Sequence, residues 1–139
     1  MKKFTLYCDG ASRGNPGPAS IGAILLKENQ EEPVATVSEA IGTATNNEAE
    51  YRSLLAGTRA FLNMVGAELT DSLLQIRMDS ELVVKQIKGE YRVKNEKLKS
   101  FYTDIKSVLA QIPNWNIQHV RRELNKEADK LANAALDKE

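Results

Sequence analysis

Four acidic residues spread along the chain have types and positions that could perform chemistry together. Asp9 closes a strand-like run, Asp79 follows another, and Glu50 and Asp129 lie near the starts of helix-like segments. Rigid strands and helices could direct all four side chains to one place. Carboxylate oxygens without a cysteine or histidine cage suit Mg²⁺ rather than Zn²⁺. The pattern therefore indicates a magnesium site of the kind that serves phosphoryl transfer.

Each of these acids also has a simpler structural explanation. Asp79 could cap a following helix, and Glu50 and Asp129 could be surface residues beside basic neighbours. Asp9 is harder to explain, because its strand would place it over the sheet and a lone buried carboxylate is costly. Capping accounts fully for the neighbouring Glu48. At ~100° per residue, Glu50 lies ~200° from it around the helix, so we assign the site to Glu50.

Hydrophobic periodicity predicts the elements that would position these acids. Strands are expected at residues 3–8, 19–27, 34–41, 73–78 and 115–121. Four helices are expected, each beginning after a capping residue: Thr45, Asp79, Asn95 and Asn125. The first of these caps, Thr45, is expected to form a capping box with Glu48. The order βββαβααβα makes the first, fourth and fifth strands parallel, through right-handed crossovers.

The predicted fold is a mixed five-stranded sheet of strand order 3-2-1-4-5 flanked by helices, in the α/β or α+β class. Ligands collect at the carboxyl ends of central parallel strands. Asp79 is expected at such an end, with Asp9 near the end of the neighbouring strand.

Composition indicates one globular domain over residues 1–139, with 42% hydrophobic and 27% charged residues. The 19 basic and 19 acidic residues cancel. Between Lys85 and Lys99, however, six basic residues face two acidic ones, which fits either a solvated helix surface or a local contact for a phosphate backbone. The one cysteine, Cys8, fits a buried position and a reducing compartment. With no run of ~18 apolar residues, we expect no membrane span and a cytoplasmic protein.

Four ordered motifs resemble type 1 ribonuclease H over essentially the whole chain. They are DGASRGNPGP at residues 9–18, TNNEAE at 45–50, MDS at 78–80 and NKEADKLA at 125–132. The stretch KGEYRVKN at residues 88–95 is similar to the compact archaeal and bacterial branch, which lacks a long basic insertion.

The resemblance implies an endoribonuclease that hydrolyses the RNA strand of RNA–DNA hybrids and leaves 5′-phosphate and 3′-hydroxyl ends. Asp9, Glu50, Asp79 and Asp129 would be catalytic and would hold two Mg²⁺ ions, with Mn²⁺ as a substitute. The ions would activate the attacking water and stabilise the leaving oxygen. The protein would act as a monomer on a hybrid duplex. Implied substrate-binding residues are Gly10, Ser12, Asn15, Thr45, Asn46, Asn47, Glu81 and Asn125.

Two departures from the family pattern stand out. Glu81 occupies a position where many relatives have glutamine. The loop before the last helix lacks the histidine that relatives often carry there, and His119 is expected inside the fifth strand. Arg121, Arg122 or Glu123 could substitute, and we expect an arginine there to engage the phosphate on the scissile side.

Three alternatives remain open from the sequence. Integrases, transposases and some exonucleases share this sheet and its carboxylates, although the Gly-Asn-Pro-Gly loop and Thr-Asn-Asn suit recognition of a 2′-hydroxyl. A non-catalytic hybrid-binding module would have the same fold, although a like-charge cluster is hard to explain without metal. The chain could also be released from a polymerase polyprotein, which its initial methionine makes a weaker expectation.

Overall fold

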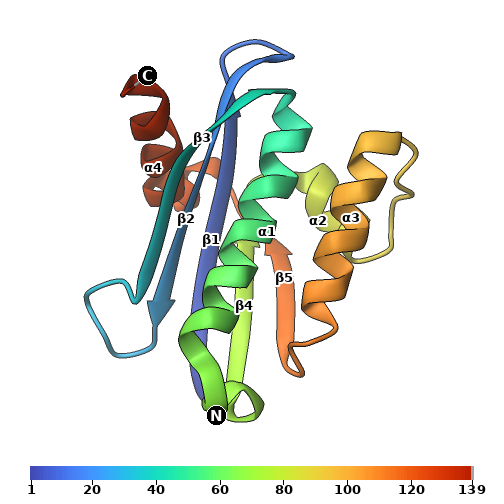
Figure 1. The fold of residues 1–139 in the computed structure, drawn as a ribbon. Helices are drawn as coiled ribbons and strands as arrows, with labels where there is room; N and C mark the ends of the chain where they lie inside the picture. Colours follow the sequence, from blue (N-terminus) through green and yellow to red (C-terminus); the bar gives the residue numbers. More distant parts are fainter. Residues whose placement is uncertain (139) are drawn as a thin grey trace.

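The computed structural model describes residues 1–138 and contains the predicted five-stranded mixed sheet. The strand order is β3-β2-β1-β4-β5, as predicted (Figure 1). β1 runs antiparallel to β2 and parallel to β4, and β4 runs parallel to β5. The strands are β1 Lys2–Ser12, β2 Gly17–Lys27, β3 Ala35–Ala44, β4 Ser72–Met78 and β5 Trp115–His119.

Helices cover both faces of this sheet. They are α1 Asn46–Val65, α2 Glu81–Ile87, α3 Glu96–Leu109 and α4 Lys126–Asp137, with short 3-10 turns η1 Gly66–Asp71 and η2 Arg122–Asn125. On one face of the sheet, α1 packs against β1 and is in turn contacted by α3. On the other face, α4 packs against β2, β1 and β3 (Figure 1). In residues 1–138 no helix is both long enough and apolar enough to cross a membrane.

Alternation along β1 separates the two faces. Phe4, Leu6 and Cys8 are buried under α1, where the rings of Phe4 and Phe61 meet edge to face with centroids 5.4 Å apart. A Cβ atom on Gly57 would lie 3.0 Å from the Leu6 side chain, so this helix approaches the strand closely. Asp9 is offset by one residue and therefore projects toward the α4 side.

The element boundaries correct several expectations. Thr45 forms the predicted capping box with Glu48. Asp79 was predicted to cap α2, but the cap is Ser80, whose hydroxyl accepts from the Val83 N–H at 3.4 Å. Asn125 precedes α4 without capping it through its side chain.

Strand lengths also differ from expectation. β1 continues beyond Asp9 to Ser12, because Gly10–Ser12 remain paired with Ala19–Ile21 of β2 in the hairpin. β5 ends at His119 rather than at residue 121. The following Val120 N–H still donates to the Met78 carbonyl at 2.8 Å, at the carboxyl end of β4.

Candidate active site

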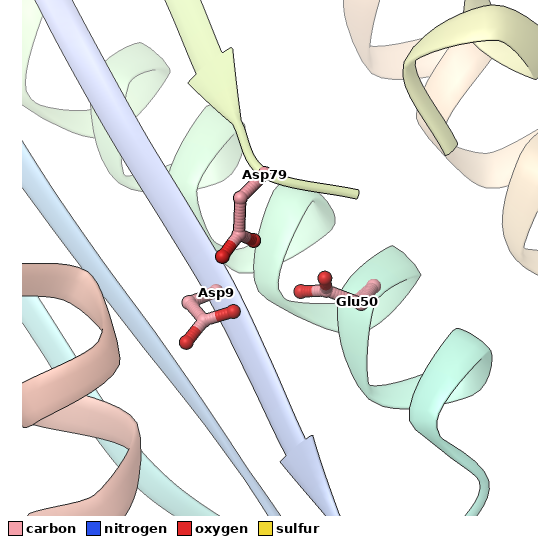
Figure 2. Close-up of side chains that lie close together, drawn as sticks. All are labelled: Asp9, Glu50 and Asp79. Carbon is pink, nitrogen blue, oxygen red and sulfur yellow. The ribbon is translucent and has the colours of Figure 1, made fainter. Parts of the chain in front are cut away.

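Three carboxylates converge at the carboxyl edge of the parallel strands. Asp9, Glu50 and Asp79 each offer an oxygen, and these oxygens all lie within 4.8 Å of one another (Figure 2). The parallel register between β1 and β4 ends at the pair Cys8 and Met78. Asp9 is the next residue of β1, and Asp79 is the first residue after β4, so strand pairing places the two aspartates side by side.

Glu50 reaches this edge because α1 crosses β1 at a glycine. A Cβ atom on Gly10 would lie 2.2 Å from the Ala49 carbonyl carbon, so no larger residue fits at this crossing. The Gly10 backbone N–H donates to Glu50 Oε1, which holds the carboxylate over the strand. Glu48 instead accepts from the Thr45 N–H at 3.1 Å, so the structure separates the two glutamates as expected.

Asp129 approaches from the opposite face, on the first turn of α4. It lies outside the group of three, but it lines the same cavity and contributes to the raised pKa of Asp9. That cavity has a volume of about 480 Å³. All four predicted acids therefore border one open space.

Burial and mutual repulsion disfavour ionisation of this cluster. The pKa of Asp9 is raised chiefly by burial and then by the charges of Glu50 and Asp79; the residue is 6% exposed. Burial also raises the pKa of Glu50, although the Gly10 N–H opposes that shift. A divalent cation would reverse the penalty by pairing with the ionised carboxylates. The all-oxygen donor set fits Mg²⁺.

Four of the predicted substrate-binding residues line the cavity: Gly10, Ser12, Asn46 and Asn47. Asn15 and Thr45 lie beside it and support the start of α1. Asn15 Oδ1 accepts the Asn46 backbone N–H at 3.0 Å, and Thr45 caps the helix.

Of the other predicted contributors, only Arg122 borders this cavity. Glu81 is exposed and pairs with Lys85 at 2.8 Å. Of the three loop residues, Arg122 lines the cavity, Arg121 is exposed ahead of η2, and Glu123 lines a separate groove with Tyr7 and Leu124.

Asn125 is placed differently from expectation. Its side chain is 1% exposed, and Nδ2 donates to the Cys8 carbonyl at 2.8 Å. Among residues 1–138 its Oδ1 is the buried side-chain polar atom without a hydrogen-bond partner. Asn125 thus braces the chain beside Asp9, and its role in substrate binding stays a prediction.

Asn133 also lines the cavity, although it was not among the site residues predicted from the sequence. Its Nδ2 donates to the Asp129 carbonyl at 3.0 Å and to Asp129 Oδ1 at 3.2 Å. A signal was available, because residues four apart on a helix face each other.

Comparison with known proteins agrees with this geometry. A family model described as reverse transcriptase-like matches residues 7–135. Ribonuclease HI of Halobacterium salinarum is 40% identical over 131 residues, which are 94% of this chain and 63% of that protein. Bifunctional protein Rv2228c of Mycobacterium tuberculosis is 39% identical over 135 residues, which are 97% of this chain and 36% of that protein. The chain thus spans only part of the length of these curated relatives.

A solved relative matches over nearly its full length. LC11-RNase H1, isolated from compost by a metagenomic approach, has a TM-score of 0.92 and 41% identity, covering 99% of this chain and 98% of the other. The structure of LC11-RNase H1 in complex with RNA/DNA hybrid has a TM-score of 0.91.

The sheet and its acidic edge define a reverse transcriptase-like domain with the ribonuclease H fold. The chain belongs to the type 1 ribonuclease H family, in its compact form, with only residues 88–95 between α2 and α3.

Proposed function

We propose that the protein is an endoribonuclease that hydrolyses the RNA strand of RNA–DNA hybrids, leaving 5′-phosphate and 3′-hydroxyl ends. The observation that carries this proposal is the convergence of four carboxylates on one open cavity, three of them within 4.8 Å of one another. Family membership supports it, as does the relative whose structure contains an RNA/DNA hybrid.

Asp9, Glu50, Asp79 and Asp129 are the residues that would hold two Mg²⁺ ions, with Mn²⁺ as a substitute. Bound there, the ions would lower the pKa of the attacking water and stabilise charge on the leaving 3′ oxygen. The chain's own part is to hold the four carboxylates in place. Strand register does this for Asp9 and Asp79, and the Gly10 N–H does it for Glu50.

The asparagines beside the acids suit recognition of RNA. A 2′-hydroxyl both donates and accepts hydrogen bonds, and so does a side-chain amide. Asn46 and Asn47 are exposed on the first turn of α1 and line the cavity. Asn15 Oδ1 is engaged by the Asn46 N–H, which leaves its amide NH₂ to donate. The glycines around Asn15 would let backbone approach the sugar edges, and the Ser12 hydroxyl steadies the loop by donating to the Ala44 carbonyl at 2.8 Å.

One assay tests this function directly. The protein is incubated with end-labelled RNA–DNA hybrid, RNA duplex, DNA duplex and single-stranded RNA, with Mg²⁺ or with EDTA. We expect cleavage of the hybrid's RNA strand alone, and only with Mg²⁺. Cleavage of DNA would favour the transposase-like alternative, and hybrid binding without cleavage would favour the non-catalytic module.

We also propose that residues 1–139 act as one catalytic domain, as a monomer, in the cytoplasm. A single sheet with helices on both faces supports the first point. A free buried cysteine, Cys8, fits a reducing compartment. Size-exclusion chromatography with light scattering tests the monomer, and a mass of two chains would contradict it.

A further inference from the structure

The Asp129 carboxylate is the one of the four acids whose side chain neither strand register nor a backbone N–H is seen to hold in place. Asp9 and Asp79 are adjacent by strand register, and Glu50 accepts a backbone N–H. Asp129 lies on α4, on the other side of β1, and must be directed toward the cluster by something else. The question is which contacts fix its direction.

The position of α4 itself is fixed by close backbone contacts with the sheet. A Cβ atom on Gly22 would lie 2.2 Å from the Ala128 carbonyl oxygen, so the helix rests directly on β2. The Ser20 and Ser38 hydroxyls donate to the carbonyls of Ala132 and Leu131. With the helix backbone held in this way, the remaining freedom of Asp129 is the rotation of its own side chain.

The side chain of Asn133 restricts that rotation through a hydrogen bond. It lies four residues after Asp129 on the same face of α4, half-buried, and borders the cavity. Its amide nitrogen donates both to the Asp129 carbonyl at 3.0 Å and to Asp129 Oδ1 at 3.2 Å. Asparagine is a weaker helix former than alanine, which occupies four other positions of this helix. The hydrogen bond to the carboxylate accounts for its presence here.

We propose that Asn133 is a positioning residue of the metal centre. Its amide donates to one oxygen of Asp129 and so restricts the rotation of the carboxylate at the cavity wall, where the group would help to hold a divalent cation. The inference rests on the proposed function, because it assigns Asn133 a role at the same site. Partners that orient a metal ligand in this way commonly change metal affinity by 10–100-fold when removed.

The test compares Asn133→Ala with Asn133→Gln, which keeps an amide donor. Calorimetric titration of Mn²⁺ into substrate-free protein measures affinity, and hybrid cleavage over a range of Mg²⁺ concentrations separates half-saturation from kcat. We expect Asn133→Ala to weaken Mn²⁺ binding and to raise the half-saturating Mg²⁺ concentration about tenfold. Asn133→Gln should lie between the alanine variant and the wild type, and the Tm in EDTA should change little.

Asn114→Ala is the matched control. Its Nδ2 likewise makes two hydrogen bonds, to the backbone carbonyls of Thr70 and Ser72, but it lies at the amino end of β4 and touches no carboxylate there. This variant should keep wild-type metal affinity. In an Asp129→Asn background, Asn133→Ala should have no further effect on Mn²⁺ affinity, because the carboxylate on which it acts is gone.

The inference would be overturned if Asn133→Ala bound Mn²⁺ with wild-type affinity. It would also be overturned if Asn133→Ala lowered Mn²⁺ affinity as much in the Asp129→Asn background as in the wild type. A wild-type protein that binds Mn²⁺ without cutting hybrid would instead refute the proposed function, while calorimetry would still decide the role of Asn133. A wild-type protein that binds no divalent cation would overturn both.

Discussion

Replacing Asp9 with a neutral residue should change stability as well as activity. Asp9 is 6% exposed and its ionisation is opposed by burial and by two other carboxylates, whereas Asp79 is half-buried at the cavity wall. Replacing Asp9 with asparagine therefore removes a ligand and a source of repulsion together.

We expect Asp9→Asn to lower hybrid cleavage more than about 100-fold, since even outer partners of a metal site are worth 10–100-fold. Its Tm in EDTA should rise, because a neutral amide relieves the like-charge cluster. Asp129→Asn should reduce cleavage less, since water can replace a ligand on the cluster's edge. Cleavage assays and calorimetry of the three proteins give the comparison; wild-type cleavage by Asp9→Asn would contradict the site assignment.

Arg122 and Arg121 form a natural pair for testing the loop before α4. Arg122 lines the acidic cavity, and its neighbour Arg121 does not. We expect Arg122→Ala to raise the KM for hybrid severalfold through loss of a phosphate contact, and Arg121→Ala to leave KM within twofold. Steady-state kinetics on both variants measure this. Equal KM values for the two variants would remove Arg122 from the substrate path.

At the scale of elements, the site depends on two glycines where helices meet strands. Gly10 lets α1 approach β1, and Gly22 lets α4 rest on β2, with separations that no Cβ atom would permit. Two helices from opposite faces of the sheet thereby bring Glu50 and Asp129 to the same edge.

Gly22→Ala should displace α4 and with it Asp129. We expect a loss of about 3 kcal/mol, the upper end for overpacking because the clash is with backbone, and a higher Mg²⁺ requirement for cleavage. Gly66→Ala is the control: its φ of 52° also makes alanine unfavourable, by about 1–3 kcal/mol, but it lies beyond the last turn of α1. Thermal unfolding measures the stability of both variants, and Mg²⁺ titrations of cleavage measure their metal requirement. If Gly22→Ala and Gly66→Ala need the same Mg²⁺ concentration, the docking of α4 does not control the site.

For the whole molecule, the acidic cluster makes stability depend on pH and metal. The pKa of Asp9 is raised to about 9 and that of Glu50 to about 8, with burial as the main cause. In the unfolded chain such groups ionise near pH 4. The folded state therefore holds more protons between these values, and the stabilisation is present in full below pH 4 and lost as pH rises through 8 to 9.

In EDTA we expect the Tm to fall as the pH rises from 5 to 9, and saturating Mg²⁺ to flatten that fall, because the cation pairs with the ionised carboxylates. Calorimetry at several pH values with and without Mg²⁺ checks this. Asp9→Asn should show a shallower slope in EDTA. A Tm that rises with pH in EDTA would have the wrong sign for this cluster.

Charge on the whole molecule is balanced but unevenly placed. Lys85 and Lys99 are paired with Glu81 and Glu96, whereas Arg92 and Lys94 are exposed in the connection between α2 and α3. A hybrid longer than the cavity could reach this connection, which lies on the side of the sheet that carries α1 and α3 (Figure 1).

Replacing Arg92 and Lys94 together with alanine should raise the KM for hybrid and lower the salt slope of log KM by about 1 to 2, with kcat little changed. Steady-state kinetics at salt concentrations between about 50 and 200 mM provide the measurement. Lys3→Ala, at the amino end of β1, is the control. Equal salt slopes in the two variants would show that the connection does not touch substrate.

The order of strands and helices was determined by the sequence alone, because hydrophobic alternation and capping residues are local signals. Local signals also singled out three candidate acids, since Asp9 and Asp79 follow strand-like runs and Glu50 lies near the start of a helix-like segment. The choice of Glu50 over Glu48 needed only the geometry of a helix.

Tertiary structure decided what depends on residues far apart in the chain. Local rules favoured Asp79 and Asn125 as helix caps, but Ser80 caps α2, and the Asn125 amide is drawn to Cys8, 117 positions away. Only the packed fold shows that Gly22 admits α4 and that Arg122 rather than Arg121 borders the cavity. These contacts form between elements, and their geometry is set by close packing of backbones that no local sequence signal encodes.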